Sequence, residues 1–278
     1  MRKVCLAQHK GNTMEFKRIE NLLAGEEISC NRTEIVRDGK EQEVLVIGEG
    51  PCKVVIYKGT YDNATDEEII SSVRSGLENK PELNDVENWT SWDYARHNVR
   101  IALRPRSNMD DNKFVKRVIN EKLEVIYRIF IPQGTIPVPV QFLERWKLTE
   151  NELYLAALMN VKHETSAMSM GSILGVDDDM GIPMIVFSTN DKNFGSSSIL
   201  NTEELERVAQ EYDDDLFIIP SSVHECIITP AKKNEYDALK QMIVEVNESQ
   251  LRPEEVLADY PFYYSKGSNK VNFEPRIA

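Results

Sequence analysis

Residues 221–225, Ser-Ser-Val-His-Glu, bring together the side-chain types of a nucleophilic catalytic site. A serine hydroxyl becomes a nucleophile when a histidine within hydrogen-bond reach takes its proton and a carboxylate orients that histidine. If the segment lies on a strand, His224 and Glu225 face opposite sides of the sheet, because successive side chains alternate. Ser222 and His224 then share a face but lie about 6.5–7 Å apart, which is too far for a direct hydrogen bond.

Three interpretations of this segment follow. A hydrolase or transferase site at Ser221–Glu225 needs a bulge or a polar group from elsewhere, such as Asn190, to bring the groups together. The chain contains no G-x-S-x-G nucleophile motif. A binding site is the second interpretation, and its candidate residues are Asn190, Ser221, Ser222, His224 and Glu225. The interpretation that we favour is structural: a hairpin whose serines satisfy the backbone of the turn.

The histidines, cysteines and acidic runs lack the spacing of a metal site. His163 and His224 are each followed by glutamate, but neither has the second histidine of a zinc-binding H-E-x-x-H helix. The three aspartates 177–179 suggest a calcium loop, yet the twelfth position of such a loop falls on Ser188. The cysteines form no C-x-x-C pair and are expected to be reduced thiols: Cys5, Cys30, Cys52 and Cys226. We therefore expect no metal and no cofactor.

Two glycine-containing segments are candidates for ligand-binding loops. Residues 48–53, Gly-Glu-Gly-Pro-Cys-Lys, lack the spacing of a phosphate-binding P-loop, and the proline removes an amide donor. Residues 190–198 are mostly small and polar and are expected to link two strands. That loop could hold a ligand through its backbone amides, but an ordinary hairpin loop is the favoured interpretation.

Composition narrows the class of protein and of partner. The chain has 278 residues, 41% hydrophobic and 28% charged, which is typical of a globular protein. Its 46 acidic and 33 basic residues give a net charge of −13, which disfavours nucleic acid and anionic membranes. The apolar stretch Val4–Ala7 is too short for a signal peptide, and no apolar run is long enough for a membrane span. We expect a cytoplasmic protein that does not bind membranes.

The first half of the chain predicts a small α+β lobe. Apolar residues at helical spacing predict a helix from Met14 to Gly25, and Asp38-Gly39 predicts a hairpin turn. Thr65 and Glu68 form a capping box that begins a second helix. Strands are expected at residues 27–36, 43–47, 53–57, 99–103 and 123–131, with irregular structure over much of 81–112.

The second half is patterned more clearly. A second capping box, Thr149 with Glu152, begins a helix, and Asn201 is expected to cap another. Strands are expected at 183–188, 195–200, 216–219 and 223–229, and further helices near 236–246 and from Pro253. The three prolines at positions 132, 137 and 139 predict an extended connector between domains.

These elements predict an α+β fold, a mainly antiparallel sheet covered by helices, with a smaller N-terminal α+β lobe. The expected organisation is a loose tail at residues 1–13, an N-terminal lobe at 14–131 and a C-terminal domain at 132–278.

Several segments together resemble a known bacterial family, catalogued as domain of unknown function 5688. The resemblance is specific from about Val138 to Tyr264 and looser from Met14 to Phe130. It is carried by residues 145–154, 183–190, 194–200, 215–225, 244–247 and 253–257. The resemblance implies an α+β, cytosolic protein of anaerobic Firmicutes, and it brings no known activity, cofactor or catalytic residue.

The sequence therefore favours a non-enzymatic module that binds a protein or peptide or has a regulatory role. A hydrolase or transferase that uses the Ser221–Glu225 hairpin is the alternative. A third hypothesis is an accessory protein of an immunity system or mobile element. The sequence sets no oligomeric state.

Overall fold

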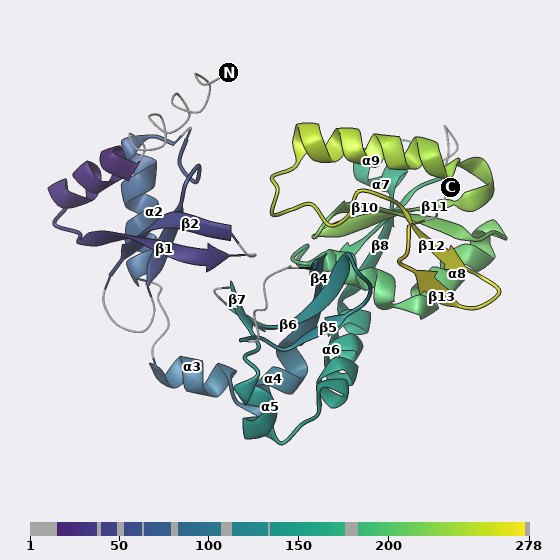
Figure 1. Ribbon diagram of the computed structural model, residues 1–278, viewed down its shortest axis with the longest axis horizontal. Coiled ribbons are helices and arrows are strands. Elements are labelled where there is room, and N and C mark those ends of the chain that lie inside the picture. Colours follow the sequence, from purple (N-terminus) through teal and green to yellow (C-terminus); the bar gives the residue numbers. More distant parts are fainter. Residues whose placement is uncertain are drawn as a thin grey trace. The chain divides into compact units, whose positions relative to one another are not determined.

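The computed structural model describes residues 16–37, 40–48, 53–62, 64–78, 83–106, 113–132, 134–175 and 183–275 (Figure 1). The chain divides into two compact units, Met1–Asn88 and Trp89–Ala278. Helices and antiparallel sheets occur in both units, so the fold is α+β, as the sequence predicts.

The smaller unit contains a three-stranded antiparallel sheet in the order β1-β2-β3. Its strands are β1 (Cys30–Arg37), β2 (Lys40–Ile47) and β3 (Val54–Tyr57). A helix at residues 16–25 and α2 (Asp66–Glu78) pack on this sheet. The core is formed by Phe16, Ile19, Leu23, Leu45, Ile47, Ile56, Ile69 and Val73. The predicted helices and the three-strand meander of this lobe are therefore confirmed.

Side-chain caps determine where two of the helices begin. The Thr65 N–H donates to Glu68 Oε2 at 2.7 Å, and the Glu68 N–H donates to Thr65 Oγ1 at 3.3 Å. Thr149 and Glu152 make the same reciprocal pair at the start of α6 (Glu150–Glu164). Each pair satisfies two backbone donors that a helix N-terminus leaves without an intrahelical acceptor. Both predicted capping boxes are confirmed.

The larger unit contains two antiparallel sheets. In the four-stranded sheet, β6 is paired on one side with β4 and on the other with β5 and β7. The strands are β4 (Val99–Pro105), β5 (Lys116–Val118), β6 (Leu123–Ile131) and β7 (Gly134–Pro137). The helices of this unit before and after them are α4 (Trp92–Asn98), α5 (Gln141–Trp146) and α6. Helix α3 (Leu83–Trp89) lies at the end of the smaller unit and reaches the division between the two.

The six-stranded sheet has the order β13-β12-β10-β11-β9-β8. Its strands are β8 (Thr165–Ser169), β9 (Ile185–Thr189), β10 (Leu216–Ser222), β11 (Glu225–Pro230), β12 (Phe262–Ser265) and β13 (Lys270–Asn272). The helical segments between them are α7 (Met170–Leu174), η2 (Gly195–Leu200), α8 (Thr202–Tyr212), η3 (Ala231–Lys233) and α9 (Tyr236–Gln250).

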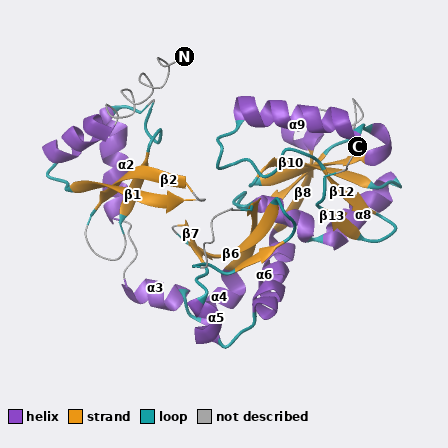
Figure 2. Cartoon of the chain, in the orientation of Figure 1, coloured by secondary structure: helices purple, strands orange, loops and turns teal. Residues whose placement is uncertain are grey.

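One hydrophobic core joins the two sheets of the larger unit. Side chains of β4 and β6 pack in the same cluster as those of β9, β10 and β11, with α6 and α8 contributing Leu153, Ala157 and Leu205. On the other face of the six-stranded sheet, α9 covers β10 through Leu239 and Ile243, and Figure 2 shows this helix along the sheet. The central strand β10 is therefore covered on both faces.

The division into units differs from the expected organisation. It falls at Asn88/Trp89, whereas the sequence predicted 131/132. The proline-rich segment is not a connector, because Gly134–Pro137 returns as β7 and pairs with β6. Proline lacks an amide donor, but Pro137 lies at the end of a short edge strand, where that donor is not needed.

Four local predictions were wrong. Residues 83–89 and 92–98 form helices α3 and α4 instead of irregular structure. Residues 195–200 form the 3-10 helix η2 instead of a strand, and residues 253–255 form only a turn. Asn201 precedes α8, yet its side chain makes no capping bond. The expected tail 1–13, the Asp38-Gly39 turn and the aspartates 177–179 lie outside the described residues.

Candidate functional site

The β10–β11 hairpin carries four of the five predicted site residues. Its turn lies at Val223 and His224, not at the expected residues 220–222, because β10 continues to Ser222. Pro220 pairs with Cys226 inside the ladder, and the register shifts between Pro220 and Ser222. Such a bulge accommodates a proline within a strand, because it removes the need for a regular amide bond there.

The hairpin's polar side chains bond to one another and to its backbone. Ser221 Oγ donates to Glu225 Oε1 at 3.2 Å. The backbone N–H of His224 donates to Ser222 Oγ at 3.0 Å. Both serine hydroxyls therefore contact hairpin groups other than the imidazole, as expected for a turn closed by serines.

The His224 ring is held by the segment that follows β9. The N–H of Phe194 donates to His224 Nδ1 at 3.2 Å, and the two rings pack at a tilt of 40° with their centroids 5.7 Å apart. Because Nδ1 accepts this bond, the proton of the neutral imidazole lies on Nε2. The histidine therefore links the hairpin to residue 194 through its side chain.

Close backbone packing at Gly195 fixes this link. A Cβ atom on Gly195 would lie 2.5 Å from the backbone oxygen of His224 and 2.6 Å from the backbone nitrogen of Thr189. Ser188 Oγ donates to the same His224 oxygen at 2.8 Å. Only glycine allows the end of β9, residue 195 and the hairpin turn to approach this closely.

Two serines of η2 add hydrogen bonds to the hairpin and to residue 194 inside the protein. Ser196, Ser197 and Ser198 are all buried. Ser196 Oγ donates to Val223 O at 2.8 Å, and Ser197 Oγ donates to Phe194 O at 3.1 Å. Ser198 Oγ and Asn201 Oδ1 are buried with no hydrogen-bond partner among the described residues. The sequence predicted a hairpin loop over residues 190–198 and a strand at 195–200, but residues 195–200 form a largely buried 3-10 helix.

Asn190, the fifth predicted site residue, belongs to a second cluster at the other end of the 190–194 loop. Its backbone N–H donates to Glu164 O at 3.0 Å, and its Nδ2 donates to Glu164 Oε2 at 3.2 Å. Arg100 Nη1 donates to Asp191 Oδ2 at 2.7 Å, and its Nη2 lies 3.8 Å from Glu164 Oε1. The guanidinium also stacks 4.0 Å above the ring of Phe130.

The charge state of Asp191 follows from its contacts. Burial raises the pKa of this carboxyl, but stronger opposing contacts hold the pKa below its usual value. Those contacts are the Asn193 N–H, the Thr189 hydroxyl and the Arg100 guanidinium. Asp191 is thus an ionised anchor for Arg100.

Sequence reasoning did not predict the two arginines of this region as site residues. Arg100 on β4 lies directly opposite Arg128 on β6 in the strand register. Arg128 Nε donates to Thr135 Oγ1 at 2.7 Å, and its guanidinium lies 4.8 Å from the Phe194 ring centroid. The alternation of arginines from Arg96 to Arg106 was visible in the sequence, but the partner strand that supplies Arg128 was not.

Strand β8 begins directly after Glu164 and forms one edge of the six-stranded sheet. All five residues of its neighbour β9 are buried, whereas none of the five residues of β8 is. Met168 has 49% of its surface exposed. The strand Thr-Ser-Ala-Met-Ser has no charged residue and no proline, the features that usually protect an edge strand from pairing.

The register of β8 shows which backbone groups point away from the sheet. Asn190 N–H bonds to Glu164 O, and Met170 N–H bonds to Met184 O, so even-numbered residues pair with β9. In an antiparallel ladder the alternate residues, Thr165, Ala167 and Ser169, therefore point their N–H and C=O groups outward. Within the part of the chain that the structure describes, Ala167 N–H and C=O have no hydrogen-bond partner.

Other candidate sites are weaker. Among the described residues, no group of three or more His, Cys, Asp or Glu side chains is arranged to hold a metal. Burial raises the pKa of the Cys226 thiol far above its usual value, so this cysteine is a structural side chain. No helix of the described residues is long and apolar enough to cross a membrane.

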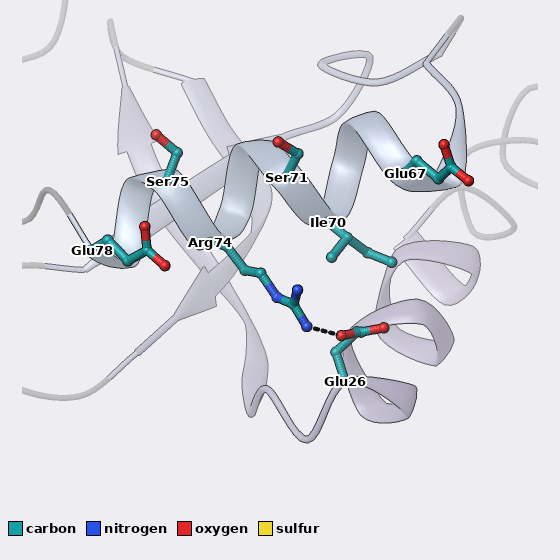
Figure 3. A pocket seen from close by; sticks show the side chains of 7 residues that line it. All are labelled: Glu26, Glu67, Ile70, Ser71, Arg74, Ser75 and Glu78. Carbon is teal, nitrogen blue, oxygen red and sulfur yellow. Dashed lines mark hydrogen bonds and ion pairs between the residues drawn. The ribbon is translucent and has the colours of Figure 1, made fainter.

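A shallow groove lies on the smaller unit between α2 and the end of helix 16–25 (Figure 3). Its lining residues are Glu26, Glu67, Ile70, Ser71, Arg74, Ser75 and Glu78. Arg74 already forms an ion pair with Glu26 across it, and the remaining groups are solvated helix side chains. This groove offers no convergent set of groups for chemistry.

Comparison with known proteins gives one match. A family model described as Family of unknown function (DUF5688) matches residues 55–266. That range covers the end of the smaller unit and most of the larger one, including the hairpin, the 190–194 loop and β8. No curated protein and no solved structure matches the chain.

Proposed function

The chain belongs to the Family of unknown function (DUF5688), and from this premise we propose that it is a non-enzymatic module that binds an extended protein or peptide segment. The segment is added as a further antiparallel strand at the edge of β8. As the sequence predicts, this binding takes place in the bacterial cytoplasm.

The observation that carries the proposal is the outward backbone of β8. Strand addition needs an edge whose N–H and C=O groups are available, and Ala167 offers both. An incoming strand would complete the ladder that β9 forms on the opposite side. Main-chain hydrogen bonds of this kind supply affinity, and side chains on alternate positions supply specificity.

The side chains of β8 suit an extended peptide with an apolar residue. Met168 is exposed, and Ile173 and Leu174 of the following helix α7 are exposed at 49% and 66%. Methionine adapts to differently shaped apolar partners because its side chain is unbranched and flexible. Ser166 lies on the same face as Met168. Its small side chain stands between the apolar Met168 and the start of the strand.

Net charge favours a basic partner over a second copy of the chain. Each copy carries −13, so two copies repel each other, whereas a basic segment is attracted. We therefore commit to a segment of another protein with net positive charge as the occupant of this edge.

The predicted site residues take positioning roles in this proposal. Asn190 holds Glu164 at the start of β8, and His224 holds the loop that begins at Asn190. The bonds of Ser221 and Ser222 within the hairpin support this assignment over a hydrolase or transferase, because both hydroxyls contact groups other than the imidazole.

The test uses proline at an outward-facing amide. Ala167→Pro removes an N–H that makes no hydrogen bond to any described residue, so the melting temperature should stay within about 3 °C of wild type. A phage-displayed library of random dodecapeptides is selected on the wild-type protein, and the selected peptides are assayed on both proteins. Ala167→Pro should weaken their binding by at least about tenfold.

The matched control is Ala167→Val, which keeps the amide and suits a strand. It should bind the selected peptides within about threefold of wild type. Equal binding of the peptides to wild type and to Ala167→Pro would mean that they bind elsewhere, and the proposal would be wrong. A library that yields no binding peptide on wild type would also count against it.

A further inference from the structure

The start of β8 carries an excess of negative charge at a defined position. Glu164 directly precedes the strand, and Asp191 lies beside it on the loop after β9. Both carboxylates contact Arg100, whose side chain is only 14% exposed, while Glu164 and Asp191 keep 34% and 41% of their side chains exposed. Within the described residues, one partly buried guanidinium thus contacts two solvent-accessible carboxylates.

Glu164 points to the same face of the sheet as Met168. Its side chain bonds to that of Asn190, its cross-strand neighbour, and side chains that are directly opposite share a face. Ser166 and Met168 follow at alternate positions, so Glu164, Ser166 and Met168 line one side of the edge. An added strand would present side chains to these three residues at every second position.

We infer that the segment accepted by β8 carries a basic side chain four residues away from an apolar one, with the basic group beside Glu164 and the apolar group beside Met168. This inference rests on the proposed function. The order of the two along the segment is set by antiparallel pairing: the apolar residue comes first, and the lysine or arginine follows. Directly opposite cross-strand residues have Cβ atoms about 4.5–5.5 Å apart, within reach of such an ion pair.

The geometry also explains why Arg100 does not already neutralise the site. Its short bond goes to Asp191, at 2.7 Å, and its distance to Glu164 is 3.8 Å. Stacking on Phe130 fixes the guanidinium over that ring. Glu164 is therefore the carboxylate with the weaker cationic contact, and its side chain also accepts a hydrogen bond from the neutral amide of Asn190.

The experiment repeats the dodecapeptide selection on Glu164→Lys and Glu164→Gln and compares the enriched sequences with those from wild type. Wild type should enrich Lys or Arg four residues after an apolar residue. Glu164→Gln should lose that enrichment, and Glu164→Lys should replace it with Asp or Glu. A wild-type peptide with the basic residue should bind Glu164→Lys about five- to tenfold more weakly.

Glu274→Lys is the matched control, since it makes the same charge change at an exposed position near β13, the opposite edge of the sheet. It should retain the wild-type pattern. An unchanged pattern on Glu164→Gln and Glu164→Lys, together with lost binding on Ala167→Pro, would overturn this inference and leave the proposed function intact. Normal binding on Ala167→Pro would overturn the proposed function itself.

Discussion

Replacing Gly195 with alanine should destabilise the larger unit strongly. The added Cβ would lie 2.3 Å from Ser188 Oγ, 2.5 Å from His224 O and 2.6 Å from Thr189 N. The serine side chain can rotate away, but the two backbone atoms belong to β9 and to the hairpin turn. Relief therefore requires moving the turn away from β9, which also stretches the bond from Ser188 Oγ to His224 O.

The expected loss is at least about 3 kcal/mol of unfolding free energy, at the upper end of the range for inserted groups in packed sites. For a unit of this size, that loss lowers the melting temperature by about 6–12 °C. Tryptophan fluorescence is a suitable assay, because all three tryptophans, Trp89, Trp92 and Trp146, belong to the larger unit.

Gly267→Ala provides the control. No described atom lies within 4 Å of a Cβ placed on Gly267, and this glycine has no left-handed backbone conformation that disfavours alanine. Its melting temperature should stay within about 2 °C of wild type. If Gly195→Ala melted at the same temperature as Gly267→Ala, the close approach of the hairpin to β9 would be refuted.

Two further predictions concern buried and titrating groups. Ser196→Ala loses the bond to Val223 O and should cost about 1 kcal/mol of unfolding free energy. Ser198→Ala removes a buried hydroxyl that has no partner among the described residues, so it should be neutral or stabilising. Urea unfolding measures both, and the reverse order would contradict the hydrogen bonds described. The lowered pKa of Asp191 means that its ionised form stabilises the fold above its ordinary value of 3.8, and that this contribution is lost as pH falls through the lower folded value. Asp191→Asn should therefore lower the melting temperature at pH 6, and the difference from wild type should shrink towards pH 3; a difference that grows on acidification would contradict the sign.

Much of the fold was predictable from local patterns. The capping boxes at Thr65 and Thr149 each identify where a helix begins, because the cap is a local interaction between residues three positions apart. Strand β6 was predicted with its observed bounds, since Leu123–Ile131 is apolar apart from Glu124 and Arg128 and is rich in β-branched and aromatic residues. The α+β class follows from such elements.

Other elements depend on contacts that the local sequence does not contain. Residues 195–200 look like a strand, but Gly195 must approach β9 and the hairpin, and this forces the 3-10 turn. Pro220 suggests a turn, yet the bulge beside it allows β10 to continue. Tertiary contacts outweigh local propensity at both places.

The candidate site was predictable only in part. Asn190 and His224 were proposed from residue type, and the structure connects both to the 190–194 loop. The sequence pointed to Glu164 only through the incomplete zinc motif at His163, and it gave no reason to select Met168. The edge position of β8 depends on strand order, which becomes visible only when β8, β9 and β11 are paired.

The most direct test of the account is amide hydrogen exchange at Ala167, measured by NMR on the free protein and with a selected dodecapeptide bound. In the free protein this amide should exchange rapidly, while its neighbours Ser166 and Met168, which bond to β9, are protected. With the peptide bound, exchange at Ala167 and Ser169 should slow by at least about tenfold. Protection of Ala167 in the free protein, or unchanged exchange in the complex, would contradict the claim that β8 is an open edge that accepts a strand.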